Sequence, residues 1–142
     1  MSPDISARLR AVADALPLRP GLRVLEIGCG PGALAREIAR RIAGGHVLAI
    51  DRSARAIAQA AALSQKEIAA GRLSLRRVAV EDFELARGEA CFDLAVAVRV
   101  GALDGRHPEA GRRARACIAG ALRPGGRLFV DVDGRLREIE CK

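Results

Sequence analysis

Residues 24–35 read VLEIGCGPGALA and place three glycines within five positions, directly after an apolar run. Glycine tolerates positive φ and allows another molecule to approach the main chain closely. Apolar residues then recur at Leu34, Ile38 and Ile42, which is helical spacing. The stretch therefore predicts a strand, a tight glycine turn and a helix, with the turn bringing the backbone close to a bound nucleoside.

The same alternation of strand and helix continues on both sides of this stretch. Further strands are expected at 46–51, 73–80, 92–98 and 127–132, helices at 4–16, 54–70 and 109–122, a turn at 123–126 and a last edge strand within 134–141. Strands that alternate with helices imply right-handed crossovers and a mostly parallel sheet. We expect an α/β fold in which one doubly wound sheet carries helices on both faces and residues 1–142 form one domain.

The amino-acid composition limits the kinds of molecule that the protein is expected to bind. A net charge of +7 invites a nucleic-acid interpretation, but arginine supplies nearly all the positive charge, and Lys66 and Lys142 are the only lysines. The chain has three Phe and neither Tyr nor Trp, so it offers few faces on which single-stranded bases could stack. A nucleic-acid substrate therefore remains a weaker candidate than a small molecule.

The cysteines and the N-terminal residues indicate a cellular compartment. Four widely spaced cysteines without a CxxC pair are not a zinc pattern and are typical of free thiols in a reducing compartment; they are Cys29, Cys91, Cys117 and Cys141. The first residues lack the apolar stretch of a signal peptide, and no run approaches the ~18 apolar residues of a membrane span. We expect a cytoplasmic protein without a metal site or a membrane partner.

Asp51 is a second mark of a nucleoside site. It ends the strand 46–51, about twenty residues after the glycines, where an acid can accept hydrogen bonds from both hydroxyls of a ribose. In an open α/β sheet, ligands bind beyond the carboxyl ends of the strands, where the strand order reverses. The glycine turn and Asp51 would both lie at that place and together define a nucleoside-sized slot.

Two cofactor classes remain open at this point. Gly28, Gly30 and Ala33 satisfy the permissive form of the dinucleotide fingerprint, which favours NAD. Glu26 argues against NAD, because a carboxylate two residues before the first glycine repels a pyrophosphate and suits a cationic ligand. The chain is also short for a dehydrogenase, since no second mononucleotide-binding half remains.

The residues resemble the class I (Rossmann-like) S-adenosylmethionine-dependent methyltransferases. VLEIGCGPG is similar to the first motif of that family and VLAIDRSARAI to the second, while FDLAVAV and ALRPGGRLFV are similar to its fourth and fifth strands. The resemblance spans about residues 20–132 and suggests a short form of the family. It implies a 3-2-1-4-5 strand order, with the methionine end of the cofactor over Glu26 and the glycines and its ribose between Asp51 and Arg52.

The resemblance also departs from the family pattern in three places. The acid that reads the adenine amino group is replaced by Ala79, so either Glu81 or the amides near Val80 take that role, and Phe83 either covers the adenine or belongs to the core. No Asn-Pro-Pro-Tyr-like segment follows the fourth strand. The terminal antiparallel hairpin is missing or reduced to 134–141, which leaves an edge that a homodimer or a partner would cover.

The resulting hypothesis is a methyltransferase that uses S-adenosyl-L-methionine on a small molecule by in-line transfer. The predicted cofactor-binding residues are Glu26, Gly28, Cys29, Gly30, Gly32, Asp51, Arg52, Val80, Glu81 and Val98. Alternatives are a catalytically degenerate binding module, an RNA methyltransferase and an NAD-binding domain. No catalytic residue is assigned, because positioning alone can accelerate methyl transfer. His107 is either a base or a solvent-facing residue, Arg99 either orients an anionic substrate or is an ordinary surface arginine, and His46 lies at the opposite end of the sheet.

Overall fold

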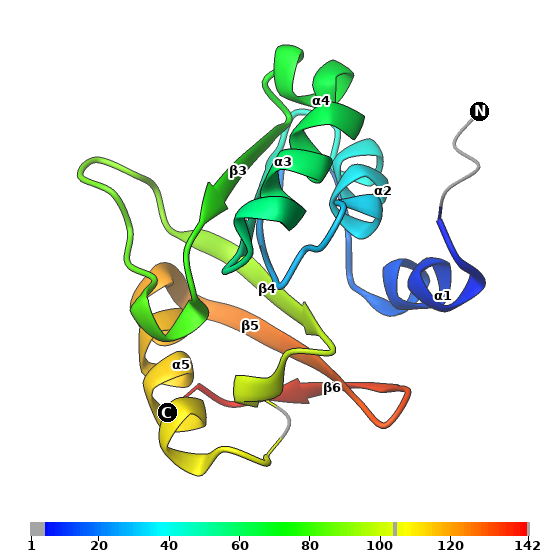
Figure 1. Cartoon of the computed structure of the whole chain (residues 1–142). Helices are drawn as coiled ribbons and strands as arrows, with labels where there is room; N and C mark the ends of the chain where they lie inside the picture. Colours follow the sequence, from blue (N-terminus) through cyan, green and yellow to red (C-terminus); the bar gives the residue numbers. More distant parts are fainter. Residues whose placement is uncertain (1–4, 104, 142) are drawn as a thin grey trace.

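The computed structural model describes residues 5–103 and 105–141 and contains a six-stranded sheet in the order β3-β2-β1-β4-β5-β6 (Figure 1). The strands are β1 Arg23–Ile27, β2 His46–Asp51, β3 Leu73–Arg77, β4 Phe92–Val98, β5 Leu122–Val132 and β6 Arg135–Ile139. The first five strands are parallel, and β6 pairs antiparallel with β5. The predicted order of five strands is confirmed, and the expected edge strand is present as the second arm of a hairpin.

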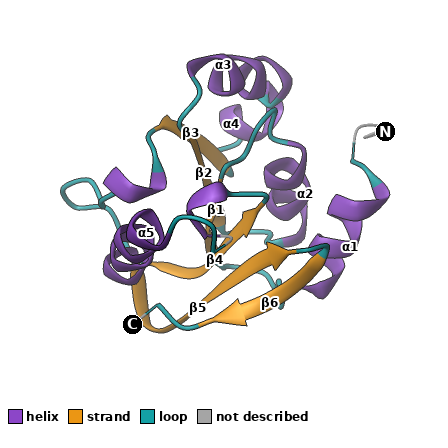
Figure 2. Cartoon of the chain, turned by 60° about the horizontal axis from the view of Figure 1, so that its bottom comes forward, coloured by secondary structure: helices purple, strands orange, loops and turns teal. Residues whose placement is uncertain are grey.

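Helices cover both faces of this sheet, as predicted. They are α1 Ala7–Ala15, α2 Ala33–Arg41, α3 Ala54–Leu63, α4 Gln65–Ala69 and α5 Pro108–Ala121, with short 3-10 turns η1 Val80–Asp82 and η2 Gly101–Leu103. Figure 2 shows α1 and α2 on one side of the sheet and α5 on the other. None of the helices in the described part of the chain is long and apolar enough to cross a membrane.

Successive side chains of each strand point to opposite faces, so the sheet separates two apolar cores. Val24 and Val47 belong to the core shared with α1 and α2, whereas Leu25 and Leu48 belong to the core shared with α5. Strands buried on both faces read as nearly continuous apolar runs, which is the pattern of FDLAVAV. This arrangement fixes the carboxyl ends of β1, β2 and β4 side by side at one edge of the sheet.

The connection from β3 to β4 contains no helix longer than η1, and a buried side chain covers the sheet there instead. Phe83 is 1% exposed and packs in the α5-side core. The Arg76 guanidinium lies 5.7 Å from the centre of the Phe83 ring, and its Nη2 donates to Glu89 Oε2 at 2.8 Å. Phe83 therefore has the core role and does not cover a ligand.

The helix expected over 54–70 is interrupted at Ser64. The Ser64 side chain is fully buried, and its Oγ accepts a hydrogen bond from Arg36 Nη1 at 3.0 Å. Its backbone has φ −117° and ψ 24°, outside the helical range, so α3 ends before it and α4 starts after it. The buried contact with Arg36 explains why helix propensity alone placed the end of α3 too late.

The turn expected at 123–126 lies inside β5 as an irregularity of its pairing with β4. Phe92 pairs with Leu122 and Leu94 with Arg127, so one residue of β4 faces four of β5. Gly125 takes φ +81°, and Arg123 forms an ion pair with Asp93 across the shifted register. The turn residues are thus accommodated as a bulge between two paired segments.

The first helix is shorter than the expected range 4–16. It starts after Ser6, whose Oγ accepts a hydrogen bond from Leu9 N at 3.2 Å and caps the helix. Asp4 lies outside the described residues. Val12 and Leu16 are buried against the sheet, and this packing places the first turn of α1 beside the carboxyl edge of the strands.

Candidate functional site

The glycine turn after β1 has the backbone that its sequence predicts. Gly28, Gly30 and Gly32 have φ of 73°, 52° and 89°, a region that is unfavourable for residues with a Cβ. The amides of Gly28 and Cys29 both donate to Ile50 O, at 2.8 and 3.0 Å, which ties the turn to the end of β2. A Cβ on Gly30 would meet nothing within 4 Å, so the turn presents bare main chain to open space.

Two cavities flank this turn at the carboxyl edge of the sheet. The β3-side cavity, of about 440 Å³, is lined by Ile27, Gly28, Ile50, Asp51, Arg52, Val78, Ala79, Val80, Glu81, Arg99, Val100, Gly101, Ala102, His107 and Ala110. The α1-side cavity, of about 410 Å³, is lined by Ser6, Arg8, Leu9, Glu26, Gly28, Cys29, Gly30, Pro31, Ala33, Leu34, Asp51, Val98 and Arg99. Gly28, Asp51 and Arg99 line both, so the cavities meet at these residues and form one site.

Asp51 is oriented at this meeting point by two main-chain hydrogen bonds. Its Oδ2 accepts from Gly30 N and its Oδ1 from Ser53 N, each at 2.9 Å. A carboxylate oxygen has two lone pairs, so each oxygen can accept one more hydrogen bond. Asp51 can therefore bind a pair of neighbouring hydroxyl groups while it keeps the glycine turn in place.

Glu26 is a buried acid with an unused oxygen in the wall of the α1-side cavity. The residue is 3% exposed, and Glu26 Oε1 has no hydrogen-bond partner among the described residues. Burial, and then the charge of Asp51, raise the pKa of Glu26 to about 8, against a smaller opposing effect of Arg36. A cationic group in this cavity would pair with the orphaned oxygen and restore the ionised carboxylate.

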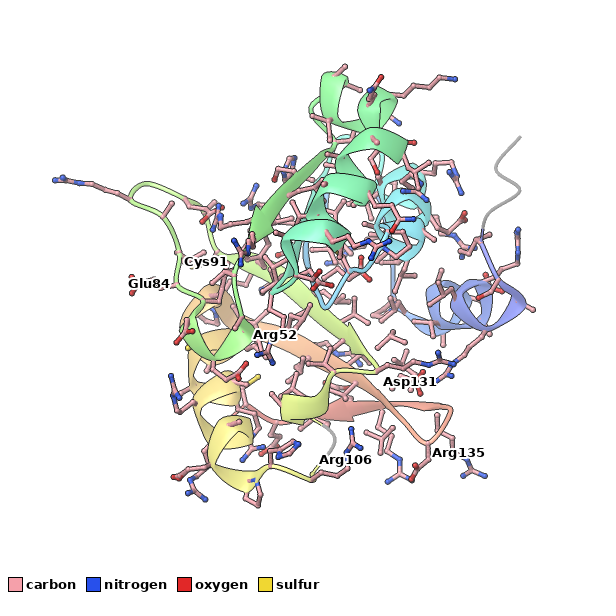
Figure 3. All side chains as sticks on the ribbon, in the orientation of Figure 1. Arg52, Glu84, Cys91, Arg106, Asp131 and Arg135 are labelled. Carbon is pink, nitrogen blue, oxygen red and sulfur yellow. The ribbon has the colours of Figure 1, made fainter. Side chains whose placement is uncertain are left out.

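Arg8 brings a cation to the same cavity from α1, and sequence reasoning missed it. Arg8 Nη2 donates to Asp131 Oδ2 at 2.7 Å, and the Asp131 side chain is only 2% exposed. Arg8 Nε and Asp131 Oδ1 have no hydrogen-bond partner in the described part of the chain. Figure 3 shows Asp131 on the side of the molecule where α1 packs. The α1-side cavity thus contains charges of both signs.

Gly32 is the one predicted site residue that lines neither cavity. A Cβ on Gly32 would lie 3.0 Å from Arg36 Nη1 and 3.3 Å from Ala60 Cβ, so this glycine allows close packing under the turn. Arg36, which is 6% exposed, also donates to Pro31 O at 2.8 Å. The other predicted residues line the cavities: Glu26, Gly28, Cys29, Gly30, Asp51, Arg52, Val80, Glu81 and Val98.

Cys29 is a buried free thiol under this turn. It is 6% exposed, and burial, followed by the charges of Glu26 and Asp51, raises its pKa to about 12. The thiol therefore stays protonated at neutral pH and is a poor nucleophile. Its Sγ donates a hydrogen bond to Gly30 O at 3.5 Å, inside the turn.

The β3-side cavity is lined mainly by buried or half-buried apolar and small residues, together with a few polar side chains. Val80 and Glu81 both line it, so the structure brings the two alternatives for adenine recognition to the same cavity, with Ala79 beside them. Arg52 lines the same cavity, and Figure 3 shows its side chain below α3, toward η2. His107 also lines this cavity, whereas His46 bonds to Gly71 O and Ser74 Oγ, both at 2.8 Å, and lines neither cavity.

Comparisons with known proteins agree with this geometry. A family model described as a methyltransferase domain matches residues 24–126, and the chain belongs to this family of class I S-adenosylmethionine-dependent methyltransferases. It is 38% identical over 128 residues to a ubiquinone biosynthesis O-methyltransferase of Xylella fastidiosa, covering 90% of this chain and 48% of that protein. The chain therefore spans about half the length of the curated relative that it matches.

Solved structures share the fold. A methyltransferase from Geobacter sulfurreducens, crystallised with S-adenosyl-L-homocysteine, is 25% identical to this chain, and the two structures align with a TM-score of 0.68. The alignment covers 89% of this chain and 47% of the Geobacter chain. The cyclase SpnF is 28% identical to this chain and aligns with a TM-score of 0.68. That alignment covers 86% of this chain and 43% of the SpnF chain. The sequence resemblance to the family is confirmed, and the cyclase shows that the same fold carries more than one chemistry.

Proposed function

We propose that the protein binds S-adenosyl-L-methionine across the two cavities and transfers its methyl group to a small molecule. The observation that carries this proposal is the buried, unpartnered oxygen of Glu26 in a cavity that meets a second one at Asp51. A ligand with a cationic amino-acid tail and a ribose matches both groups at once. A singly charged anion or a nucleotide without a cationic group would not match both Glu26 and Asp51.

The charged groups of the site fit the two ends of this cofactor. In the α1-side cavity, Glu26 would bind an ammonium group, and Arg8 would bind a carboxylate while remaining paired with Asp131. At the junction, Asp51 would accept from two ribose hydroxyls. In the β3-side cavity, Glu81 or the main chain beside Val80 would contact the adenine.

The chain contributes mainly by positioning. When bound, the cofactor supplies an electrophilic methyl group, and the acceptor needs a lone pair aligned with the carbon–sulfur bond. Holding both molecules in this geometry can account for ~7–11 kcal/mol of a barrier. Glu26 and Asp51 fix the cofactor, and the wall formed by 99–102 and His107 bounds the space left for the acceptor. His107 lines this space and is a candidate for the general base.

The hydrogen bonds of the turn argue against a dinucleotide. Gly30 N already donates to Asp51, and Gly32 N donates to Cys29 O at 3.0 Å, so these amides do not face a pyrophosphate. The Asp51 carboxylate lies at the same turn and would repel the two negative charges of a pyrophosphate, while the buried Glu26 would be ionised by a cationic ligand and not by an anionic one. These features favour the sulfonium cofactor over NAD.

Two observations support a small-molecule acceptor. The matched relative in Xylella fastidiosa is named an O-methyltransferase of ubiquinone biosynthesis, which acts on a small molecule. In addition, neither cavity is lined by a Phe side chain within the described residues, so a flipped base would find no ring to stack on apart from His107. We therefore favour a small acceptor over RNA.

Calorimetric titration with S-adenosylmethionine, S-adenosylhomocysteine and NADH tests this function. We expect the first two to bind and NADH not to bind. Asp51→Ala should weaken S-adenosylhomocysteine at least tenfold, or about 1.4 kcal/mol, whereas Glu138→Ala, which removes an exposed acid that lines neither cavity, should not. Binding of NADH alone, or unchanged affinity of Asp51→Ala, would refute the assignment.

Turnover separates an enzyme from a binding module with the same fold. Incubation of the wild-type protein and labelled methyl donor with a cell extract should yield a labelled small product that Asp51→Ala does not form. Tight binding of S-adenosylhomocysteine without any labelled product would favour the catalytically degenerate module.

A further inference from the structure

Arg99 stands at the centre of the site described above, immediately after β4. It lines both cavities, a property it shares only with Gly28 and Asp51 among the described residues. If the two cavities hold the two ends of the cofactor, their meeting point is where the reactive methyl group and the acceptor come together. The following argument rests on that proposed function.

The backbone of Arg99 is unusual for its residue type. It has φ +57°, a left-handed conformation that few non-glycine residues adopt, and such strained positions concentrate at functional sites. The turn at Arg99 brings Val100 over the glycine turn, where Val100 Cγ2 would lie 2.7 Å from a Cβ on Gly28. Glycine would make this turn at lower cost, so the turn itself does not account for a long cationic side chain.

The guanidinium of Arg99 is also unpaired within the described part of the chain. No described residue forms a hydrogen bond or an ion pair with it, whereas Arg8 and Arg36 in the same region are bonded to Asp131, Pro31 O and Ser64. An unpaired cation next to a bound sulfonium cation raises the energy of the complex. A negative charge on the acceptor would compensate both cations, and a planar guanidinium is well suited to bind an oxyanion.

We propose that Arg99 binds an oxyanion of the methyl acceptor, so that the substrate is a small organic anion held in the β3-side cavity between Arg99 and His107. The guanidinium fork would fix the anionic group and thereby the orientation of the nucleophilic atom. Arg99 thus determines specificity for charged over neutral acceptors. The nearby Asp51 carboxylate faces the same space and would repel an anion from the cofactor half of the site.

Binding to the product complex tests this assignment without any measurement of activity. The probes are 4-hydroxybenzoate, phenyl phosphate and the neutral 4-hydroxybenzamide, titrated into protein saturated with S-adenosylhomocysteine. We expect at least one anion to bind about tenfold more tightly than the amide, in line with a charge-assisted hydrogen bond. The benzoate and phosphate arms show which oxyanion the site prefers. Equal affinity for all three probes would overturn the proposal.

Matched variants assign the preference to Arg99. Arg99→Gln should abolish it, Arg99→Lys should retain most of it, and Arg55→Gln, which removes an exposed charge that lines neither cavity, should leave it intact. Arg99→Gly provides a second charge-free variant whose backbone accepts the positive φ. Retention of the preference in both charge-free variants would also overturn the proposal.

The cofactor pair gives an independent readout. Without an acceptor, Arg99→Gln should improve the affinity for S-adenosylmethionine relative to S-adenosylhomocysteine by about threefold or more, because only the former carries the sulfonium charge. An unchanged ratio would contradict the repulsion on which the argument depends. If neither compound binds the wild-type protein, the proposed function fails and this proposal with it. If both bind but the probes show no dependence on Arg99, only this proposal fails.

Discussion

The α1-side and β3-side cavities have similar volumes, about 410 and 440 Å³, but they are built from different groups. The α1-side cavity is lined by the ionisable side chains of Glu26 and Arg8, with Asp131 nearby, and all three are wholly or partly buried. The β3-side cavity is lined by main chain, small apolar residues and exposed polar side chains such as Arg52 and His107.

This difference separates two tasks. Burying an ionised group is costly unless it is paired. Arg8 is paired with Asp131, whereas Glu26 holds a proton until a cationic ligand pairs with it. The α1-side cavity is therefore suited to bind one invariant, doubly charged ligand end tightly. The β3-side cavity has no comparable buried charge and can vary its contacts at low cost, which suits recognition of a neutral base and an acceptor. Perturbing each side should show this asymmetry.

The largest expected effect is on pH dependence through Glu26. Its pKa is near 4.5 in the unfolded chain and about 8 in the folded protein. Between these values the folded state keeps a proton that the unfolded state has lost, so the free energy of unfolding falls as pH rises. The decrease should be on the order of several kcal/mol, since each pKa unit is worth about 1.4 kcal/mol.

Denaturant unfolding at pH 5, 6.5 and 8 measures this decrease. Glu26→Gln should flatten the pH profile over that range, and Glu109→Gln, at an exposed ion pair, should not. Binding of S-adenosylhomocysteine at pH 7 should also release a proton, detectable by calorimetry in buffers of different ionisation enthalpy. An equally steep profile in Glu26→Gln would exclude Glu26 as its source.

Removal of Arg8 should have the next largest effect. Arg8→Ala leaves the Asp131 carboxylate, 2% exposed, without its cation, and we expect a loss of about 1–3 kcal/mol in unfolding free energy because Arg8 itself is partly exposed. Arg112→Ala breaks an ion pair whose side chains are 64% and 73% exposed and should cost about 0.5 kcal/mol or less. Urea unfolding compares the two variants. Equal losses of unfolding free energy in the two variants would mean that the Arg8–Asp131 pair stabilises the fold no more than an exposed ion pair does.

The smallest effect is expected on the β3 side. Glu81→Gln should change the affinity for S-adenosylhomocysteine by about threefold or less, because the half-buried Glu81 borders an open cavity in which main-chain groups beside Val80 can also bind an adenine. Calorimetric titration of the variant measures this change. A loss of tenfold or more would identify Glu81 as the acid that reads the adenine and would remove much of the asymmetry between the cavities.

The sequence predicts most of the sheet because its determinants are local. Each parallel strand is an apolar run bounded by turn residues, and the crossover rules then restrict the possible orders. The break at Ser64 could not be predicted in this way, since it depends on Arg36, which is 28 residues away in the chain. A buried polar contact overrode a helix propensity that was correct on both sides of it.

The residues of the site also differ in whether nearby sequence or a distant contact places them. Glu26, the glycines and Asp51 were predictable because motif spacing and strand ends bring them together. Arg8 was not, because its partner Asp131 lies 123 residues further along, and nothing in the pattern of α1 shows which strand it covers. One signal was available: Asp131 interrupts the apolar run of β5 near the carboxyl edge, where a buried acid needs a cation.

The buried guanidinium under the glycine turn has a consequence for ligand exchange. Arg36 connects the Pro31 carbonyl to Ser64 at the junction of α3 and α4, so the turn can shift only if this whole anchored unit shifts with it. We therefore expect the floor of the site to behave as a rigid platform. Val100 packs over Gly28 of this floor, so we expect any widening of the site for ligand exchange to come from the segment 99–103 and not from the glycine turn.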